Sequence, residues 1–258
     1  IGNPNTGKTS VFNALTGLNQ KVGNYPGITV EKKIGFSSLN KLTKARILDL
    51  PGTYSLNASS MDESLVVELL LNKNDPDYPD VAVVITDVEN LKRNLLLFSQ
   101  IKDLEIPTIL VVNMSDQISR KGIKINVKKL KEKLNTEVIL VSTRKNSGLS
   151  DLKKVLADYR ELTIKPFLNT EILDEEYFES LKLAFPNQSP YKLWLVITQD
   201  INFSVLERQK VSDTSAFRSL PRSQLKNLQQ RETIKRYQLI NQILKETYKK
   251  NLEDATDL

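Results

Sequence analysis

The sequence predicts an α/β protein with a doubly wound, mostly parallel sheet, followed by a small all-helical domain. Two observations carry this prediction. Apolar runs of strand length alternate with helical patterns in the first half of the chain, and all nine glycines lie between Gly2 and Gly148. An α/β domain needs glycine in its loops, whereas glycine destabilises helix interiors. We therefore expect a first domain over residues 1–162 and a helical domain over residues 166–258.

The elements of the first domain follow from hydrophobic spacing. Short apolar runs predict strands at residues 45–50, 81–85, 108–112 and 138–141. Apolar residues spaced by three or four predict helices at residues 61–71, 90–104, 127–134 and 149–159. This alternation is typical of a parallel sheet with helices on its faces.

The second domain is predicted to consist of short helices separated by Pro186, Pro190 and Pro221. Its last helix has the clearest periodicity. We expect one buried face on that helix, formed by Ile234, Tyr237, Ile240 or Asn241, Leu244 and Tyr248.

The composition excludes several classes of site. The chain has no histidine and no cysteine, and its formal net charge is +6. It therefore lacks a disulfide framework, a Cys/His zinc site and a histidine-assisted nucleophile. A metal bound here needs oxygen ligands, which favours hard ions such as Mg²⁺ or K⁺.

Residues 2–9 read Gly-Asn-Pro-Asn-Thr-Gly-Lys-Thr, the full pattern of a phosphate-binding loop. Lys8 would contact the β- and γ-phosphates, Thr9 would bind Mg²⁺, and the helix at residues 10–15 would point its positive end at the anion. The nucleotide-binding residues predicted here are Gly2, Asn3, Pro4, Asn5, Thr6, Gly7, Lys8, Thr9 and Ser10. Such a loop follows a buried strand, so we expect further residues upstream of Ile1.

A second motif lies about forty residues later, at the end of a predicted strand, where ligands bind in open α/β sheets. It consists of Asp49, Leu50, Pro51 and Gly52. Asp49 would hold Mg²⁺ through water, and the Gly52 amide would sense the γ-phosphate.

Two more motifs would contact the base. One contains Asn113, Met114 and Asp116, and the other contains Ser142, Thr143 and Arg144. The Asp116 carboxylate can accept two hydrogen bonds from guanine, and adenine offers no such donor pair. Four motifs in this order predict a Ras-like P-loop GTPase that binds GTP, GDP and Mg²⁺.

Residues 22–30 are predicted to form a mobile loop, because they contain two glycines and a proline. Thr29 is the candidate switch residue, which would close on Mg²⁺ only when the γ-phosphate is present. The nucleotide-binding residues predicted in this loop are Gly27, Ile28, Thr29 and Val30.

The phosphate-binding loop and residues 22–31 and 49–56 closely resemble the cytoplasmic GTPase region of the bacterial ferrous iron transport protein B (FeoB) family. Further segments fit the same family: residues 87–95, Gln100, Ile106 with Pro107, Asn113 with Met114, and residues 121–125. The resemblance is specific to about residue 155; beyond it, residues 232–237 are similar to the family's last soluble helix.

This resemblance implies a regulatory role in Fe²⁺ uptake at the cytoplasmic face of the bacterial inner membrane. The helical domain would modulate nucleotide release. The implied partners are a C-terminal transmembrane domain, a small cytoplasmic Feo accessory protein and a second copy of the chain in a homo-oligomer.

The resemblance also bears on hydrolysis. Ras-type enzymes orient water with a glutamine, and Thr53 occupies that place here. In potassium-stimulated relatives an asparagine equivalent to Asn5 binds K⁺ beside the phosphates, and the backbone of Gly23 and Tyr25 would complete the site. The resemblance thus implies slow, K⁺-stimulated hydrolysis, with the catalytic groups Asn5, Lys8, Thr29 and Gly52. The family's usual alanine is replaced by Thr143, which leaves its contact with the base open.

Some alternatives stay open. Residues 208–250 carry eleven Lys/Arg and three Asp/Glu, which fits a membrane-proximal cytoplasmic segment and equally a solvated set of helix faces. We expect no nucleic-acid binding, because an RNA-binding Gly-x-x-Gly loop needs glycine and none follows Gly148. The alternative functions are a soluble ribosome- or tRNA-associated GTPase and a GTP-binding sensor that scarcely hydrolyses.

Overall fold

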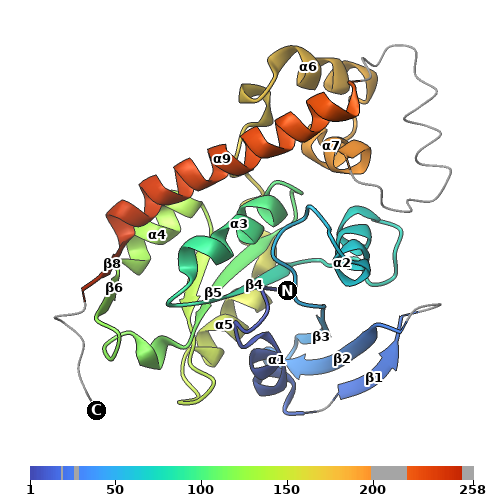
Figure 1. The fold of residues 1–258 in the computed structure, drawn as a ribbon. Coiled ribbons are helices and arrows are strands. Elements are labelled where there is room, and N and C mark those ends of the chain that lie inside the picture. Colours follow the sequence, from blue (N-terminus) through green and yellow to red (C-terminus); the bar gives the residue numbers. More distant parts are fainter. Residues whose placement is uncertain (19, 26–28, 199–219, 252–258) are drawn as a thin grey trace.

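The computed structural model describes residues 1–258 except 19, 26–28, 199–219 and 252–258. It confirms the predicted α/β architecture (Figure 1). Three strands pair in parallel in the order β4 (Ala82–Asp87), β5 (Thr108–Asn113) and β7 (Glu137–Leu140). Every residue of β5 is buried, as expected for a central strand covered on both faces.

Helices cover both faces of this sheet. The predicted ranges 61–71 and 127–134 coincide with α2 (Met61–Leu71) and α4 (Val127–Leu134). α3 (Leu91–Lys102) and α5 (Leu149–Ala157) are slightly shorter than predicted, and the 3₁₀ turn η2 (Tyr159–Glu161) follows α5. The side chains form two apolar clusters, one with α1 (Lys8–Thr16) and α5 and the other with α2, α3, α4 and the helical part.

The strands before the parallel sheet form an antiparallel meander of β1 (Gln20–Asn24), β2 (Glu31–Ser38) and β3 (Lys44–Asp49). The prediction of a loop from residue 22 is therefore wrong for residues 22–24. All five residues of β1 are exposed, so no alternating apolar pattern marks the strand, and its backbone pairing with β2 defines it.

The phosphate-binding loop begins beside β4. Gly2 forms a parallel bridge with Ile85, and the Ile85 amide donates to the Ile1 carbonyl at 2.8 Å. The loop leads into α1 (Lys8–Thr16). The carboxyl ends of β3, β4 and β5 and the start of α1 thus lie at one edge of the fold.

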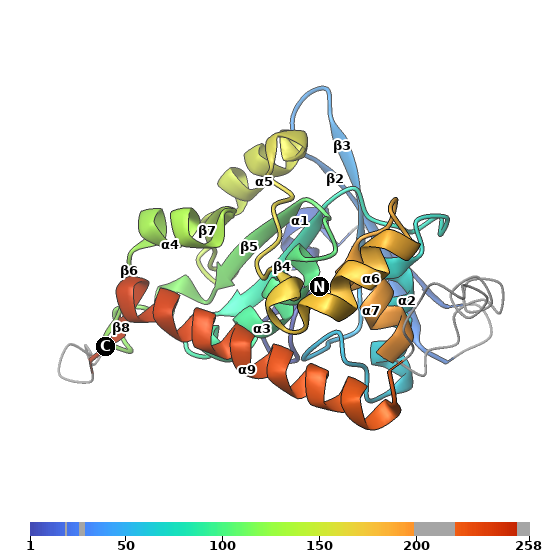
Figure 2. The same ribbon diagram turned by 90° about the horizontal axis from the view of Figure 1, so that it is seen from above.

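The described part of the last third of the chain is mainly helical. The 3₁₀ turn η3 (Thr170–Ile172) precedes α6 (Glu175–Ala184), α7 (Pro190–Thr198) and the 26-residue α9 (Arg222–Thr247). α9 runs along α3 and α4, on the side away from β1–β3 (Figures 1 and 2). After it, β8 (Tyr248–Lys250) pairs antiparallel with β6 (Ile123–Ile125).

The buried face of α9 differs from the predicted one. Ile234 is 58% exposed and Asn241 is exposed, whereas Ile240 and Leu244 are buried as predicted, and Tyr237 and Tyr248 are half-buried. The buried residues of α9 are Leu228, Glu232, Arg236, Ile240, Leu244 and Thr247. Apolar periodicity could not find this face, because two of its members are charged residues that pair within the protein.

Because α9 packs against α3 and α4, the division at residues 162–166 into separate domains stays a prediction. Among the described helices, none combines the length and apolar character needed to cross a membrane.

Candidate functional site

Two hydrogen bonds and the close approach of Asn113 to Gly7 fix the backbone of the phosphate-binding loop. The Thr6 hydroxyl donates to the Asn3 carbonyl at 2.9 Å, and the Asn113 side-chain amide donates to the Thr6 carbonyl at 3.0 Å. Gly7 has a φ of +79°, and a Cβ there would lie 2.3 Å from Asn113 Nδ2. Glycine is therefore required at residue 7, and Asn113 from β5 braces the loop.

Three predicted ligands of phosphate and Mg²⁺ converge at the start of α1. Lys8 Nζ lies 2.6 Å from Asp49 Oδ1, and the Thr9 hydroxyl lies 3.0 Å from Asp49 Oδ2. The first amides of α1 have no carbonyl acceptor within the helix. One ammonium, free amides, a hydroxyl and a carboxylate thus meet here, a donor set that suits phosphates with a hard cation.

This donor set also fits Mg²⁺ better than a transition metal. Within the described residues there is no group of three or more Asp, Glu, His or Cys side chains placed to hold a metal. Mg²⁺ is characteristically held by one or two protein oxygens, with phosphates and water supplying the rest. Thr9 and Asp49 match that arrangement.

The loop after β3 is packed against the phosphate-binding loop. The Thr53 amide donates to the Gly2 carbonyl at 3.2 Å, and a Cβ at Gly52 would lie 3.1 Å from Pro4 Cγ. Leu50 is buried and Pro51 half-buried. The Thr53 side chain is fully buried, with its hydroxyl 3.0 Å from the Ser55 carbonyl. That hydroxyl therefore stabilises the loop and is turned away from solvent.

Glu63 anchors this loop, a role that none of the predicted motifs indicated. Glu63 Oε1 accepts from the Thr53 hydroxyl at 3.1 Å and from the Tyr54 amide at 3.3 Å, while Oε2 accepts from the Ser59 amide and hydroxyl. Burial alone would raise the pKa of Glu63, but these hydrogen bonds hold it below its ordinary value. The signal was the Ser60-x-x-Glu63 spacing at the start of α2, where the Ser60 hydroxyl accepts from the Glu63 amide.

The predicted base-reading residues also meet. The Ser142 hydroxyl donates to Asp116 Oδ1 at 2.6 Å, and the Ser115 amide donates to the Val141 carbonyl at 3.0 Å. Met114 has a φ of +61°, which turns the chain between β5 and Asp116. Ser142 thus orients the carboxylate while leaving its second oxygen available. Thr143 is half-buried and Arg144 exposed, and neither side chain hydrogen-bonds within the described residues.

The remaining predicted residues are not brought to this edge by any hydrogen bond of the described residues. Thr29 and Gly23 are exposed; Val30 is half-buried, and its carbonyl accepts from the amide of the buried Tyr25. Gly27 and Ile28 lie outside the described residues. Ser10 and Asn5 are exposed at the start of α1 and in the loop before it.

Comparison with known proteins identifies close relatives of the whole chain. The family model described as "Ferrous iron transport protein B" matches residues 1–156. The Fe(2+) transporter FeoB of Leptospira biflexa is 36% identical over 96% of this chain. The chain spans only 37% of the length of that relative.

Solved structures agree along nearly the full length. The cytosolic domain of L. pneumophila FeoB has a TM-score of 0.77 at 32% identity, with 96% of this chain and 98% of that chain covered. The cytosolic domain of T. maritima FeoB in its GMPPNP form has a TM-score of 0.80 at 27% identity, with 96% of each chain covered. The GDP form I of the same domain has a TM-score of 0.78.

Proposed function

The chain belongs to the ferrous iron transport protein B family and carries its N-terminal GTPase-fold region, and from that premise we propose that it is the GTP-hydrolysing switch of an Fe²⁺ transporter. The observation that carries this proposal is the convergence of Lys8, Thr9 and Asp49 at one edge of the fold, where Asp116 lies with Ser142. The family match replaces the alternative of a ribosome- or tRNA-associated GTPase.

Recognition of the base rests on Asp116. Its Oδ1 already accepts from Ser142, so the carboxylate is held in one orientation before a ligand arrives. Guanine presents two donors to such a carboxylate, and adenine would place an acceptor and no matching donor pair against it. GDP and GMPPNP forms of the T. maritima relative support a guanine nucleotide here.

The phosphate-binding loop would hold the diphosphate, with the amides of residues 5–8 donating to it and Lys8 shifting from Asp49 toward the β- and γ-phosphates. Thr9 and Asp49 would hold Mg²⁺, which neutralises phosphate charge when bound. The Gly52 amide, held beside Pro4, would donate to the γ-phosphate, and Thr29 would close over it in the GTP state.

Hydrolysis would proceed without a side chain that orients water, because the Thr53 hydroxyl is engaged with Ser55 and Glu63. Stabilisation of charge between the β- and γ-phosphates is then the main source of rate. Asn5 is exposed, and its side chain makes no hydrogen bond within the described residues, so its oxygen is available to a K⁺ ion. The backbone of Gly23 and Tyr25 would complete the coordination of that ion.

The wider role follows from the family. We propose that a C-terminal transmembrane region, a small accessory protein and a second copy of the chain are partners, and that the nucleotide state regulates Fe²⁺ uptake at the inner membrane. The chain has no histidine or cysteine, so selection of Fe²⁺ is assigned to residues outside it.

The test is calorimetric titration of the chain with GDP, GMPPNP and ADP in Mg²⁺, followed by single-turnover GTP hydrolysis in K⁺ and in Na⁺. We expect both guanine nucleotides to bind, ADP to fail, and K⁺ to accelerate hydrolysis. Binding without hydrolysis in either salt would instead support the GTP-sensor alternative, and equal rates in the two salts would refute the role of K⁺.

A further inference from the structure

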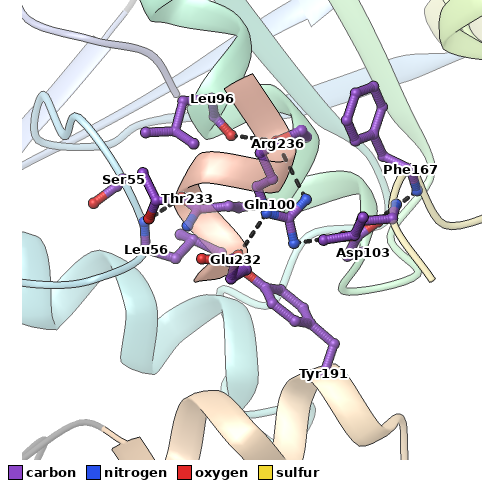
Figure 3. Close-up of polar contacts among 12 residues, drawn as sticks. Ser55, Leu56, Leu96, Gln100, Asp103, Phe167, Tyr191, Glu232, Thr233 and Arg236 are labelled. Atoms are coloured by element: carbon purple, nitrogen blue, oxygen red, sulfur yellow. Dashed lines mark hydrogen bonds and ion pairs between the residues drawn. The ribbon is translucent and has the colours of Figure 1, made fainter. Parts of the chain in front are cut away.

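Two sequence features that resemble the family have no place in the nucleotide contacts: Gln100, and the segment at residues 232–237. The structure brings them together at the last turn of α3. Figure 3 shows their side chains converging between the loop at Leu56, α3 and α9.

Gln100 connects this turn to the loop that follows Asp49–Gly52. Its Oε1 accepts a 2.8 Å hydrogen bond from the Leu56 amide, and both residues are 0% exposed. Leu56 lies four residues after Gly52, whose amide is the proposed contact of the γ-phosphate. Gln100 therefore fixes one end of that loop, while the Thr53 amide fixes the other on Gly2.

Arg236 of α9 holds the same turn of α3 from the opposite side. Its Nη1 donates to the Ser99 hydroxyl at 3.2 Å, and its Nη2 lies 2.6 Å from Asp103 Oδ2. Its Nε donates to Glu232 Oε1 at 2.5 Å. Ser99 precedes Gln100 in the chain and Asp103 follows it. The guanidinium therefore contacts the end of α3 on both sides of Gln100.

The rest of the network orients Arg236. The Tyr191 hydroxyl of α7 donates to Glu232 Oε1 at 3.2 Å, and the guanidinium carbon lies 4.9 Å from the centre of the Tyr191 ring. Asp103 Oδ1 accepts from the amides of Phe167 and Leu168, in the connection to the helical part. The side chains of Arg236, Glu232 and Asp103 are at most 1% exposed, so water does not compete for these bonds.

We propose that Gln100 and Arg236 are positioning residues for the γ-phosphate loop: Arg236 sets the last turn of α3, and Gln100 transmits that position to Leu56. The proposal rests on the proposed function. Neither residue touches nucleotide. Their effect is to keep residues 52–56 in the conformation that packs on the phosphate-binding loop, in advance of ligand.

The contacts from Arg236 through Gln100 to Leu56, called the relay below, should affect the binding of GTP and GDP differently. When a nucleotide binds only one conformation of a loop, its apparent Kd rises as the fraction of molecules in that conformation falls. GTP and its analogues use the Gly52 amide, whereas GDP lacks the γ-phosphate. Loss of the relay should therefore lower the affinity for GMPPNP and spare that for GDP.

The first variant is Gln100→Leu, which has similar volume and replaces the whole side-chain amide with an apolar group. Gln100 Nε2 makes no hydrogen bond within the described residues, so the bond to the Leu56 amide is the one that is lost. We expect GMPPNP affinity in Mg²⁺ to fall about three- to tenfold, the value of one buried hydrogen bond, with GDP affinity unchanged. Hydrogen exchange of the Leu56 amide should accelerate. A folded variant that loses affinity for both nucleotides equally, or for neither, would overturn the proposal.

The second variant is Arg236→Lys, which keeps the charge but cannot reach Ser99, Asp103 and Glu232 together. It should lower the GMPPNP to GDP affinity ratio and speed exchange at Leu56, and the double variant with Gln100→Leu should be less than additive. Additive effects would contradict a relay. If Arg236→Lys does not fold, Tyr191→Phe removes only the hydroxyl bond to Glu232 and should give a smaller change in the same direction.

The matched control is Lys245→Met, which removes a cation from an exposed position of α9 and should leave the affinity ratio and Leu56 exchange unchanged. Wild-type binding separates the two hypotheses. A wild-type chain that binds neither nucleotide refutes the proposed function, whereas normal binding with an unchanged ratio in Gln100→Leu refutes the relay alone.

Discussion

Two regions of the molecule depend on charged side chains: the candidate nucleotide site around Lys8 and Asp49, here called the edge, and the contact of α9 with α3 around Arg236, here called the junction. The two regions differ in how far their charges are buried. At the edge, the Lys8 and Asp49 side chains are 14% and 5% exposed and pair with one another across a face open to ligand. At the junction, the buried Arg236 forms ion pairs with the buried Glu232 and Asp103. Charges at the edge can exchange partners for phosphate at low cost, whereas charges at the junction are buried, so losing one partner would leave the other charge unpaired and without water.

The largest expected effect tests the junction. Arg236→Met leaves the carboxylates of Asp103 and Glu232 buried without their cation, and should lower the free energy of unfolding by about 3–5 kcal/mol in urea denaturation. Adding Asp103→Asn and Glu232→Gln removes the unpaired charges and should recover most of the loss. If Arg236→Met is as stable as Lys245→Met, the junction does not depend on its charges.

At the edge, the corresponding substitution should affect binding and spare folding. Asp116→Asn replaces the proposed acceptor of two guanine donors with an amide, which should cost about 1.5–3 kcal/mol, a roughly ten- to hundredfold loss of GTP affinity. Xanthine nucleotides should gain affinity. Calorimetry measures both, with Asp151→Asn, an exposed carboxylate on α5, as the matched control. Unchanged GTP affinity would mean that Asp116 does not read the base.

A smaller effect is expected at Thr29. Thr29 is exposed and makes no hydrogen bond within the described residues, so Thr29→Ala should not change GDP affinity. It should lower GMPPNP affinity, because its proposed contact with Mg²⁺ needs the γ-phosphate. Titration with both nucleotides provides the comparison, and equal losses would show that Thr29 has a structural role.

The response to K⁺ isolates a single side chain of the phosphate-binding loop. Asn5 has a φ of +66°, so Asn5→Gly removes the amide without backbone strain, whereas alanine would add strain. Asn5→Gly should abolish the difference in single-turnover rate between K⁺ and Na⁺ and leave GDP affinity intact. A K⁺ response that persists in this variant would exclude Asn5 as a ligand.

The two regions also differ in how far the sequence predicts them. The motifs at residues 2–9, 49–52, 113–116 and 142–144 each combine a strand end with a polar loop, so local sequence places their residues at the same edge. The Asp116–Ser142 contact follows from the parallel pairing of β5 with β7. The Lys8–Asp49 contact joins the start of α1 to the end of β3, which belongs to the antiparallel meander.

The junction was not predictable in this way. Arg236 and Ser99 are 137 residues apart in the chain, and neither belongs to a motif with a known chemistry. The apolar spacing of α9 indicated a face through Ile234, which is exposed, because a buried Glu232–Arg236 pair reads as a polar surface. The exposed strand β1 was missed for the related reason that backbone pairing, without an apolar face, defines it.

The smallest expected effect tests whether the junction extends to the neighbouring Lys102. This lysine is 1% exposed, and its ammonium donates to the carbonyls of Asn135 and Thr163. Burial lowers the pKa of Lys102 from 10.5 to about 8. Between these values the unfolded chain binds more protons than the folded one, so this residue makes stability rise with pH across that window.

Lys102→Met removes this pH-dependent contribution to stability. The free energy of unfolding of the wild type minus that of the variant should therefore increase between pH 7.5 and pH 10. Urea denaturation at the two pH values measures the difference, which cancels titrations common to both proteins. Lys154→Met provides the control, because the Lys154 side chain is 76% exposed and should add no such slope. A difference in unfolding free energy that stays constant across the window would mean that Lys102 keeps its ordinary pKa. The burial that surrounds Arg236 would then not affect the ionisation of Lys102, the final residue of α3.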